Sequence, residues 1–317
     1  MRVRLSYCVV NTGARELLLS CLEAIERTAP PQIGPDEREV LVLDNASADG
    51  SVAAVREHFP GARVIELSRR RGKAENDSTL LREARGEYCL LLNEDSELLD
   101  GAAGSLVETL DANPSAAVAG PLLLNPDGSS SPCAWRLPGA GTALSGALFL
   151  HRALSVQSGG EAIRSVGWVQ SSAMLVRRAA AEQVGWLDPR FFVYSDETDF
   201  EKRLRDAGHE ILYVPAARAI HHDQMASDAT GTRRRIVEFH RNRDLYLRKH
   251  HGHTRAALLR PLHAFPYLLR AVAAAILPGH SPRRYLFHAR RALAPRATGE
   301  GIREAAEAYN KRRGMLR

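Results

Sequence analysis

The chain has 317 residues, which fits either two domains of average size or one large α/β domain with an appended tail. Its 44% hydrophobic and 25% charged residues are typical of a globular protein and exclude a disordered or collagen-like chain. Four cysteines without CxxC or metal-ligand spacing exclude a disulfide scaffold and predict reduced, mostly buried thiols of a cytoplasmic protein: Cys8, Cys21, Cys89 and Cys133.

Charge is distributed unevenly along the chain. Residues 261–317 contain 11 lysines and arginines against 3 acidic residues, a net charge of +8, whereas residues 1–260 carry 32 against 34, or −2. A basic tail on a nearly neutral body suits contact with an anionic surface such as phospholipid headgroups or nucleic acid. A solvated helical face is the alternative interpretation.

Neither a signal peptide nor a membrane span is predicted. The first four residues lead straight into a strand-like run, without the apolar core and cleavage site of a signal peptide. The sequence has no stretch of 18 consecutive apolar residues that could cross a bilayer. We therefore expect a cytoplasmic protein.

The first 120 residues alternate short apolar runs with helical patterns. We expect strands at 3–10, 39–44, 63–67 and 88–92. Between them we expect helices at 14–27, 51–58 and 77–84. This alternation predicts right-handed crossovers and a mainly parallel sheet covered by helices on both faces. Ligands of such sheets bind beyond the carboxyl ends of the strands, so residues that follow strands should be informative.

The pattern loosens after Gly120. Residues 128–165 are rich in Gly, Ser and Ala and predict a long mobile loop. Beyond it we expect a strand over 168–177, a helix over 198–207 and a strand over 210–214. From residue 232 the chain is predicted to be helical to its end, with breaks at five prolines: Pro261, Pro266, Pro278, Pro282 and Pro295.

Acidic residues follow the fourth predicted strand directly. Asn93, Glu94 and Asp95 are poorly suited to packing there but well placed to hold a divalent cation, since Mg²⁺ bridges one or two carboxylates to substrate phosphates. A polar strand-to-loop turn is the alternative. The pair His221 and His222 follows a later strand, and would matter only if the fold brings it near Asp95.

Two further strand ends carry candidate nucleotide-binding residues. Asp44, at the end of the second strand, can accept hydrogen bonds from a base or ribose, although this segment is equally typical of a helix start. Residues 69–73 (RRRGK) follow the third strand and could face a diphosphate, with Gly72 allowing close approach, or form a solvated loop. Arg241 and Arg243 raise the same question later in the chain.

Three acids lie at the start of the helix predicted near residue 198. Asp196, Glu197 and Asp199 follow an apolar run, which indicates a site wall where a carboxylate could act as a general base. The alternative is that acids in a first turn simply favour the helix dipole.

In order along residues 3–250, these segments resemble glycosyltransferase family 2, whose members have the GT-A fold, and most closely its bacterial rhamnosyltransferase-like branch. Residues 42–51 (VLDNASADGS) are similar to the family's VDNaSxDGS segment, and residues 91–95 (LLNED) to its Asp-x-Asp position. Residues 84–88 (ARGEY), 186–192 and 196–208 also resemble family segments, as does the histidine pair.

The resemblance implies an α/β fold of the GT-A type, with a mainly parallel central sheet, helices on both faces and a C-terminal helical tail. It implies a glycosyltransferase domain over 1–250, with a nucleotide-sugar half at 1–120 and an acceptor half at 121–250, and a basic helical extension over 251–317. The implied activity is a metal-dependent inverting transfer, with Mg²⁺ or Mn²⁺, from a nucleoside-diphosphate sugar such as dTDP-rhamnose or a UDP-sugar. The acceptor would be a hydroxyl of a cell-envelope glycan or lipid-linked sugar.

The resemblance also assigns roles to individual residues. Glu197 would be the catalytic base, with Asp196 as the alternative. The metal would be held by Asp95, Glu94 and His221. Asp199, Arg241 and Arg243 would face the acceptor or the diphosphate. The donor nucleotide would be bound by a larger set: Asn11, Asp44, Asn45, Gly72, Lys73, Asn76 and Asn93.

Two other functions compete with this interpretation. A nucleotidyltransferase would show a glycine-rich loop after the first strand, where residues 11–15 (NTGAR) are poor in glycine. A nucleic-acid-binding protein would use the basic tail, which lacks a zinc motif and an aromatic stacking set, so no nucleic acid is expected. Residues 257–278 instead suit a helix in the headgroup plane of the inner face of the plasma membrane, or one packed on the catalytic domain.

Overall fold

The computed structural model describes residues 3–222, 229–277 and 281–315, so the expected break at Pro278 lies outside the described residues. Within these ranges ten strands form one curled sheet, whose main path has the order β3-β2-β1-β4-β11-β6-β12-β5. The bounds of these strands are β1 Leu5–Asn11, β2 Arg38–Asp44, β3 Arg63–Glu66, β4 Tyr88–Asn93, β5 Ser96–Leu98, β6 Ala116–Leu124, β11 Ala173–Arg177 and β12 Glu210–His221. Two short strands join at the side, β7 Ser130–Ser131 and β9 Arg164–Ser165, while β8 Ala134–Trp135 pairs with β10 Trp168–Val169.

The first four strands are parallel, as their alternation with helices predicts, and β6 pairs in parallel with β12. Their apolar runs are buried on both faces; Leu90, Leu91 and Leu92 of β4 are at most 1% exposed. β11 runs antiparallel between β4 and β6, and β5 is antiparallel to β12. The fold is therefore the expected mixed α/β architecture with a mostly parallel sheet, and all four cysteines are buried thiols.

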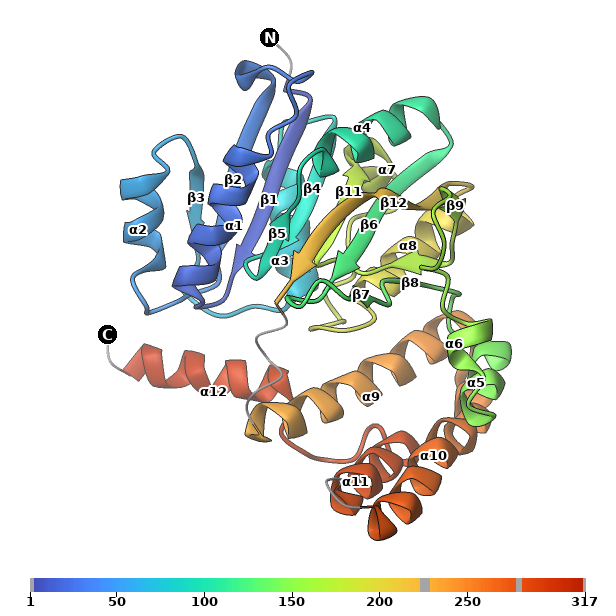
Figure 1. Cartoon of the computed structure of the whole chain (residues 1–317). Coiled ribbons are helices and arrows are strands. Elements are labelled where there is room, and N and C mark those ends of the chain that lie inside the picture. The colour runs from blue at the N-terminus through green and yellow to red at the C-terminus, as the bar shows by residue number, and fades with distance from the viewer. Residues whose placement is uncertain (1–2, 223–228, 278–280, 316–317) are drawn as a thin grey trace.

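Helices cover both faces of this sheet, with α1 in front of it and α3 behind it in Figure 1. Burying one face of each helix against the strands gives the layered core. The helices around the sheet are α1 Arg15–Arg27, α2 Ser51–His58, α3 Lys73–Glu83, α4 Ala102–Ala112, α7 Arg178–Gln183 and α8 Asp196–Asp206, with a short 3₁₀ turn η1 at Pro35–Glu37.

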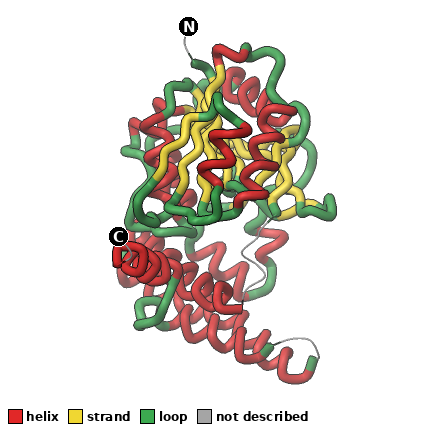
Figure 2. The backbone as a smooth tube through the Cα atoms, turned by 90° about the vertical axis from the view of Figure 1, so that its left-hand side faces the viewer, coloured by secondary structure: helices red, strands yellow, loops and turns green. Residues whose placement is uncertain are grey.

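A second helical layer lies beyond the carboxyl ends of the first strands (Figures 1 and 2). It contains four C-terminal helices and two from the middle of the chain: α9 Ala229–His251, α10 His253–Ile276, α11 Pro282–Leu293 and α12 Ile302–Met315, with α5 Ala140–Ala147 and α6 His151–Leu154. The layer places residues 140–154 beside α10, although more than a hundred residues separate them in the sequence. No described helix is both long enough and apolar enough to cross a membrane.

Several expected boundaries are wrong. The loop expected at 128–165 contains α5, α6 and three short strands, because its small residues allow close packing against α10. Pro261 and Pro266 lie inside α10, whose packing against α5 and α11 outweighs the loss of two N–H donors. Residues 168–177 divide into β10 and β11, α3 begins four residues earlier than expected, and β12 continues seven residues further, to His221.

Candidate active site

The register of β1 and β2 aligns the first two predicted nucleotide-binding residues. Asn11 lies opposite Asp44 at the ends of the two strands, and its Nδ2 donates to Asp44 Oδ1 at 2.7 Å. The other carboxylate oxygen accepts from the Ser47 N–H at 2.9 Å. Both side chains are almost fully buried. A carboxylate oxygen has two acceptor positions, so Asp44 keeps acceptor capacity beyond these bonds.

Asn45 and Gly72 shape the loops beside this strand end. The Asn45 side chain accepts from the Arg71 N–H at 2.7 Å and donates to Arg71 O at 3.0 Å, which fixes the loop after β3. A Cβ on Gly72 would lie 2.7 Å from the carbonyl oxygen of Phe192. The close approach that Gly72 allows is therefore to the backbone before α8.

Lys73 and Asn76 lie on α3, where a loop was expected. Lys73 Nζ donates to Asp77 Oδ2 at 2.8 Å, and Asn76 is buried without a partner for its Oδ1 among the described residues. Burial opposes the charge of Lys73, but Asp77, Asp196 and Glu197 nearby hold its pKa above the usual range. Lys73, which belongs to the predicted donor half, is thus close enough to Asp196 and Glu197 of α8 to interact with their charges.

The predicted metal-binding residues come together at the ends of β4 and β12. His221 Nε2 lies 3.3 Å from Asp95 Oδ1, because β12 pairs with β5 and sets His221 opposite Ser96. Glu94 Oε1 accepts from the Thr12 N–H at 3.1 Å. Burial, and then the charge of Asp95, raise the pKa of Glu94 to about 7. The backbone N–H of His222 donates to Asp95 O at 2.9 Å, but its side chain contacts Glu97 instead, with Nε2 2.8 Å from Glu97 Oε1.

These residues fit a divalent cation of the kind that bridges protein to phosphate. Among the described residues no group of three or more His, Cys, Asp or Glu side chains is arranged so that it could hold a metal ion by itself. Mg²⁺ is usually bound by one or two carboxylates together with substrate phosphates, so three protein ligands are not required. The negative charge of Asp95 raises the pKa of Glu94, and a bound cation would offset this repulsion between the two carboxylates.

The acidic segment of α8 begins in strained backbone. Tyr194 and Ser195 both have φ near +60°, a left-handed conformation that is costly for residues with side chains and concentrates at functional sites. Neither carboxylate oxygen of Asp196 has a hydrogen-bond partner among the described residues, and its side chain is buried. Burial, and then the charge of Glu197, raise its pKa well above the ordinary value. Glu197 is partly exposed, and its buried Oε2 has no hydrogen-bond partner among the described residues.

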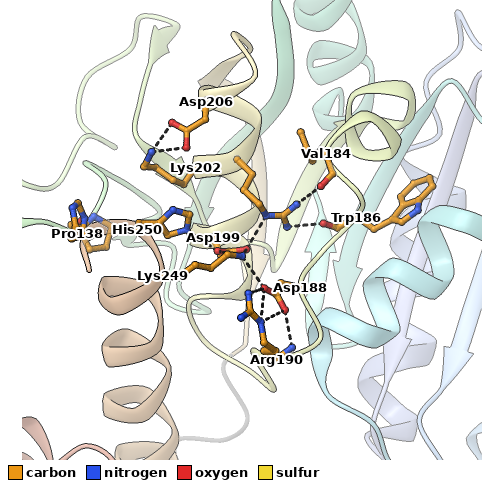
Figure 3. Close-up of polar contacts among 12 residues, drawn as sticks. Pro138, Val184, Trp186, Asp188, Arg190, Asp199, Lys202, Asp206, Lys249 and His250 are labelled. Carbon is orange, nitrogen blue, oxygen red and sulfur yellow. Dashed lines mark hydrogen bonds and ion pairs between the residues drawn. The ribbon is translucent and has the colours of Figure 1, made fainter. Parts of the chain in front are cut away.

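Asp199 lies one turn further along α8 and is completely buried among cations (Figure 3). It contacts Arg203 at 2.9 Å, Lys249 at 2.6 Å and His250 at 2.7 Å. Burial alone would raise its pKa, but the bonds from His250 and Lys249 hold it below the usual range. Lys249 also contacts Asp188 at 2.8 Å. This network fastens α8 to α9.

Arg241 and Arg243 make their contacts outside the candidate metal and base residues. Arg241 Nη1 contacts Glu304 of α12 at 2.9 Å and Glu238 at 3.4 Å. Arg243 Nη2 donates to His240 Nδ1 at 2.9 Å, inside a histidine cluster of α9, α10 and α11. Asn93 stays at the end of β4, where its N–H donates to Ser172 O at 3.0 Å.

Sequence reasoning missed the part of α12 in this site. Tyr309 and Asn310 contact the loops after β2 and β3, although 240 or more residues separate them along the chain. It also missed Lys249, the partner of Asp188 and Asp199. The basic composition of the tail pointed to an anionic partner, and gave no sign that single residues of the tail return to the sheet.

Residues 6–132, which contain Asp44, Lys73 and the Glu94–Asp95 pair, match the family model for glycosyl transferase family 2. The chain carries a glycosyltransferase family 2 domain. Relatives agree with this assignment. An N-acetylglucosaminyl-diphospho-decaprenol L-rhamnosyltransferase of Mycobacterium tuberculosis is 29% identical over 239 residues, 69% of this chain and 78% of the relative. The family 2 domain and this relative together support a glycosyltransferase.

Solved structures of GT-A glycosyltransferases share the fold. A mannosyltransferase from Pyrobaculum calidifontis in complex with GDP-Man and Mn²⁺ has a TM-score of 0.59 and 19% identity, covering 99% of this chain and 87% of that protein. The S. aureus TarS fragment 1–349 in complex with UDP-GlcNAc has a TM-score of 0.57 and 12% identity, over 92% of this chain and 82% of that fragment.

Proposed function

We propose that this family 2 enzyme is a metal-dependent inverting glycosyltransferase that moves a sugar from a nucleoside-diphosphate sugar to a hydroxyl of a lipid-linked acceptor. The observation that supports this most directly is the position of Lys73. Its charge acts on Glu94 on one side and on Asp196 and Glu197 on the other. The proposed metal-binding carboxylates and the proposed base carboxylates are therefore all within electrostatic range of one lysine. We further propose that residues 1–250 are the catalytic domain and 251–317 its helical extension.

The donor is held at the ends of β1, β2 and β4 in this proposal. Asp44 accepts from the base or ribose, and Asn11 orients its carboxylate. Asp95 and Glu94, with His221 beside them, would hold Mg²⁺ or Mn²⁺, which when bound neutralises charge on the diphosphate. Lys73 adds a positive charge near Glu94, on the side where the diphosphate would bind.

Glu197 acts as the base. In an inverting displacement the acceptor hydroxyl attacks the anomeric carbon from the face opposite the diphosphate, and the hydroxyl proton must leave. Glu197 is the better candidate to receive it because its side chain is partly exposed, whereas the Asp196 side chain is almost fully buried. Burial, and then the charge of Glu197, raise the pKa of Asp196, which makes that side chain a weaker acid than an exposed aspartate. The alternative assignment, Asp196 as the base, requires it to become exposed.

A donor panel tests the reaction. Purified protein is incubated with dTDP-rhamnose, UDP-sugars and GDP-sugars, with a polyprenyl-diphosphate-linked N-acetylglucosamine as acceptor, and release of nucleoside diphosphate is measured with and without Mn²⁺ or Mg²⁺. The M. tuberculosis relative acts as an L-rhamnosyltransferase on such a lipid, which makes dTDP-rhamnose the first donor to test. Release that needs both the acceptor and a divalent cation is expected. Acceptor-dependent release that persists in EDTA would refute the metal requirement.

A lipid-linked acceptor requires contact with a membrane surface, and we propose that α5, α6 and α10 provide it. Large apolar side chains are exposed on and between these helices. Leu148, Phe149 and Leu150 connect α5 to α6, and Leu268, Leu269 and Val272 lie on α10. The Arg270 guanidinium lies 5.4 Å from the centre of the Phe149 ring, so cationic and apolar groups share this surface. That combination suits the headgroup region of an anionic bilayer. The protein would then be peripheral on the inner face of the plasma membrane.

Liposome flotation tests this surface. The double variant Leu148→Glu/Leu150→Glu should lose binding to vesicles that contain anionic phospholipid, because two charges replace exposed apolar groups. Ile163→Glu is the control, since Ile163 is similarly exposed but precedes β9. Equal vesicle binding by the double variant and the control would remove α5 and α6 from the proposed surface.

A further inference from the structure

The C-terminal helix is hydrogen-bonded to the donor edge of the sheet. Tyr309 Oη donates to Ala46 O at 3.0 Å, and Arg313 Nη1 donates to the same carbonyl at 2.8 Å. The Asn310 carboxamide contacts both polar backbone atoms of Arg70. Its Nδ2 donates to Arg70 O at 2.9 Å, and the Arg70 N–H donates to its Oδ1 at 2.7 Å. α12 thus holds the loops that follow β2 and β3.

Arg70 connects this helix to the candidate metal site. Its guanidinium lies 3.9 Å from the centre of the Tyr309 ring, and its Nη2 donates to Thr12 O at 3.5 Å. The Thr12 N–H in turn donates to Glu94 Oε1 at 3.1 Å. The buried Nε of Arg70 has no hydrogen-bond partner among the described residues. Arg70 therefore has an unused N–H donor, and the contacts with Tyr309 and Asn310 of α12 fix where that donor lies.

A cavity of about 250 Å³ separates α12 from the strand ends. Thr12, Asn45, Arg70 and Arg71 line one side, and Tyr309 and Arg312 line the other. At one end, Arg234 and Glu300 form an ion pair at 2.5 Å. Arginines outnumber carboxylates in this lining, and guanidinium groups match the geometry of phosphate oxygens. The volume is below the 300–1,000 Å³ of typical ligand pockets, so the cavity suits a part of the donor.

We propose that α12 is a wall of the donor site, and that Tyr309 and Asn310 are positioning residues that hold Arg70 against the diphosphate of the nucleotide-sugar. This inference rests on the proposed function and adds the last helix of the chain to the donor site. Its consequence is specific: the affinity for the nucleotide depends on α12, whereas the chemical step after binding does not.

Calorimetry with dTDP, UDP and GDP in the presence of Mg²⁺ tests the proposal on full-length variants. Asn310→Ala and Tyr309→Ala should weaken binding of the preferred nucleotide at least tenfold and raise the donor KM equally, with kcat at saturating donor changed less than twofold. Tyr309→Phe keeps the ring next to Arg70 and should retain most of the affinity. Glu307→Ala and Lys311→Ala, on the exposed side of the same helix, are matched controls and should bind normally.

A double variant separates positioning from general loss of structure. If Asn310 acts through Arg70, then Arg70→Ala/Asn310→Ala should bind no more weakly than Arg70→Ala alone. Additive losses, or unchanged affinity in Asn310→Ala and Tyr309→Ala, would overturn the proposal. Tighter binding in these variants would also overturn it, because α12 would then be a cover that the donor displaces. If the unsubstituted protein bound none of the nucleotides, the proposed function itself would fail, and this inference with it.

Discussion

His221 Nε2 lies 3.3 Å from Asp95 Oδ1, although the two residues are far apart along the chain. The antiparallel pairing of β12 with β5 produces this contact, since it places His221 opposite Ser96, next to Asp95. Of the histidine pair, this register therefore brings the side chain of His221, and not that of His222, to the Asp95 carboxylate.

We expect catalysis to require this pair of residues together with a divalent cation. Asp95→Asn removes one charged ligand and should lower kcat by a factor of about 10² or more. EDTA should abolish turnover by the unsubstituted enzyme, and added Mn²⁺ or Mg²⁺ should restore it. His222→Ala is the matched control, because the side chain of His222 contacts Glu97 and not the Asp95 carboxylate. Normal turnover by Asp95→Asn in EDTA would show that Asp95 holds no catalytic metal.

The base assignment predicts a separation of binding from chemistry. Glu197→Gln keeps the shape of the side chain and removes the base, so kcat should fall by roughly 10² or more while donor affinity stays within a few-fold. Steady-state kinetics with a saturating donor measure the first quantity and calorimetry the second. A nearly normal kcat for Glu197→Gln beside an inactive Asp196→Asn would transfer the role to Asp196.

Asp44 should affect donor affinity rather than kcat. Asp44→Ala removes the acceptor for a base or ribose and also leaves Asn11 Nδ2 and the Ser47 N–H without their partner. We expect the donor KM to rise about tenfold, equivalent to about 1.4 kcal/mol of binding free energy. Asp49→Ala offers a comparison, since Asp49 lies in the same loop and bonds Arg15 and Ser51. Equal donor affinity in the Asp44 variant and the parent would argue against nucleoside recognition by Asp44.

The buried network around Asp199 should stabilise the fold far more than an exposed ion pair does (Figure 3). Lys249→Met leaves the carboxylates of Asp188 and Asp199 with one cation fewer in the interior, and should cost about 3 kcal/mol of unfolding free energy. Lys202→Met breaks a pair of similar length to Asp206, which is half exposed, and should cost at most about 1 kcal/mol. Urea unfolding of both variants gives the comparison, and equal losses would contradict the argument.

Acid should loosen the second helical layer through its histidines. Burial, and then nearby arginines, lower the pKa of His288 to about 4 and that of His263 to about 2. The unfolded chain, with ordinary histidines near 6.5, therefore binds more protons between pH 6.5 and pH 4, and stability falls as the pH drops through this range. His288→Phe keeps a ring stacked on Tyr267 and should show a smaller loss of melting temperature between pH 7 and pH 5. An unchanged loss would exclude His288 as a source of acid sensitivity.

The sequence was most informative where local pattern and position coincide. Alternating strands and helices predict the parallel strands β1 to β4, and parallel strands end at one edge, so Asn11, Asp44 and Asp95 could be assigned to one site. Contacts between distant segments could not be assigned in this way. Whether His221 or His222 reaches Asp95 depends on the register of β12, which its polar end does not reveal.

The same limit applies to the helical layer. Residues 140–154 lack a strong apolar period, and α5 is held mainly by its packing against α10, which no local pattern encodes. Prolines normally end helices, yet Pro261 and Pro266 are tolerated because tertiary contacts carry α10 past them. The helical pattern of the tail was predicted correctly, but the individual bonds of Tyr309 and Asn310 depend on three-dimensional placement.

The attachment of α12 also has a consequence for the order of events during synthesis. Ala46 is made early by the ribosome, but its carbonyl meets Tyr309 and Arg313 only after more than 260 further residues have been added. Domains generally fold from the N-terminus as they emerge, so the sheet can form while its donor-facing loops still lack these contacts. A nascent or C-terminally truncated chain therefore has an incomplete edge at Ala46 and Arg70.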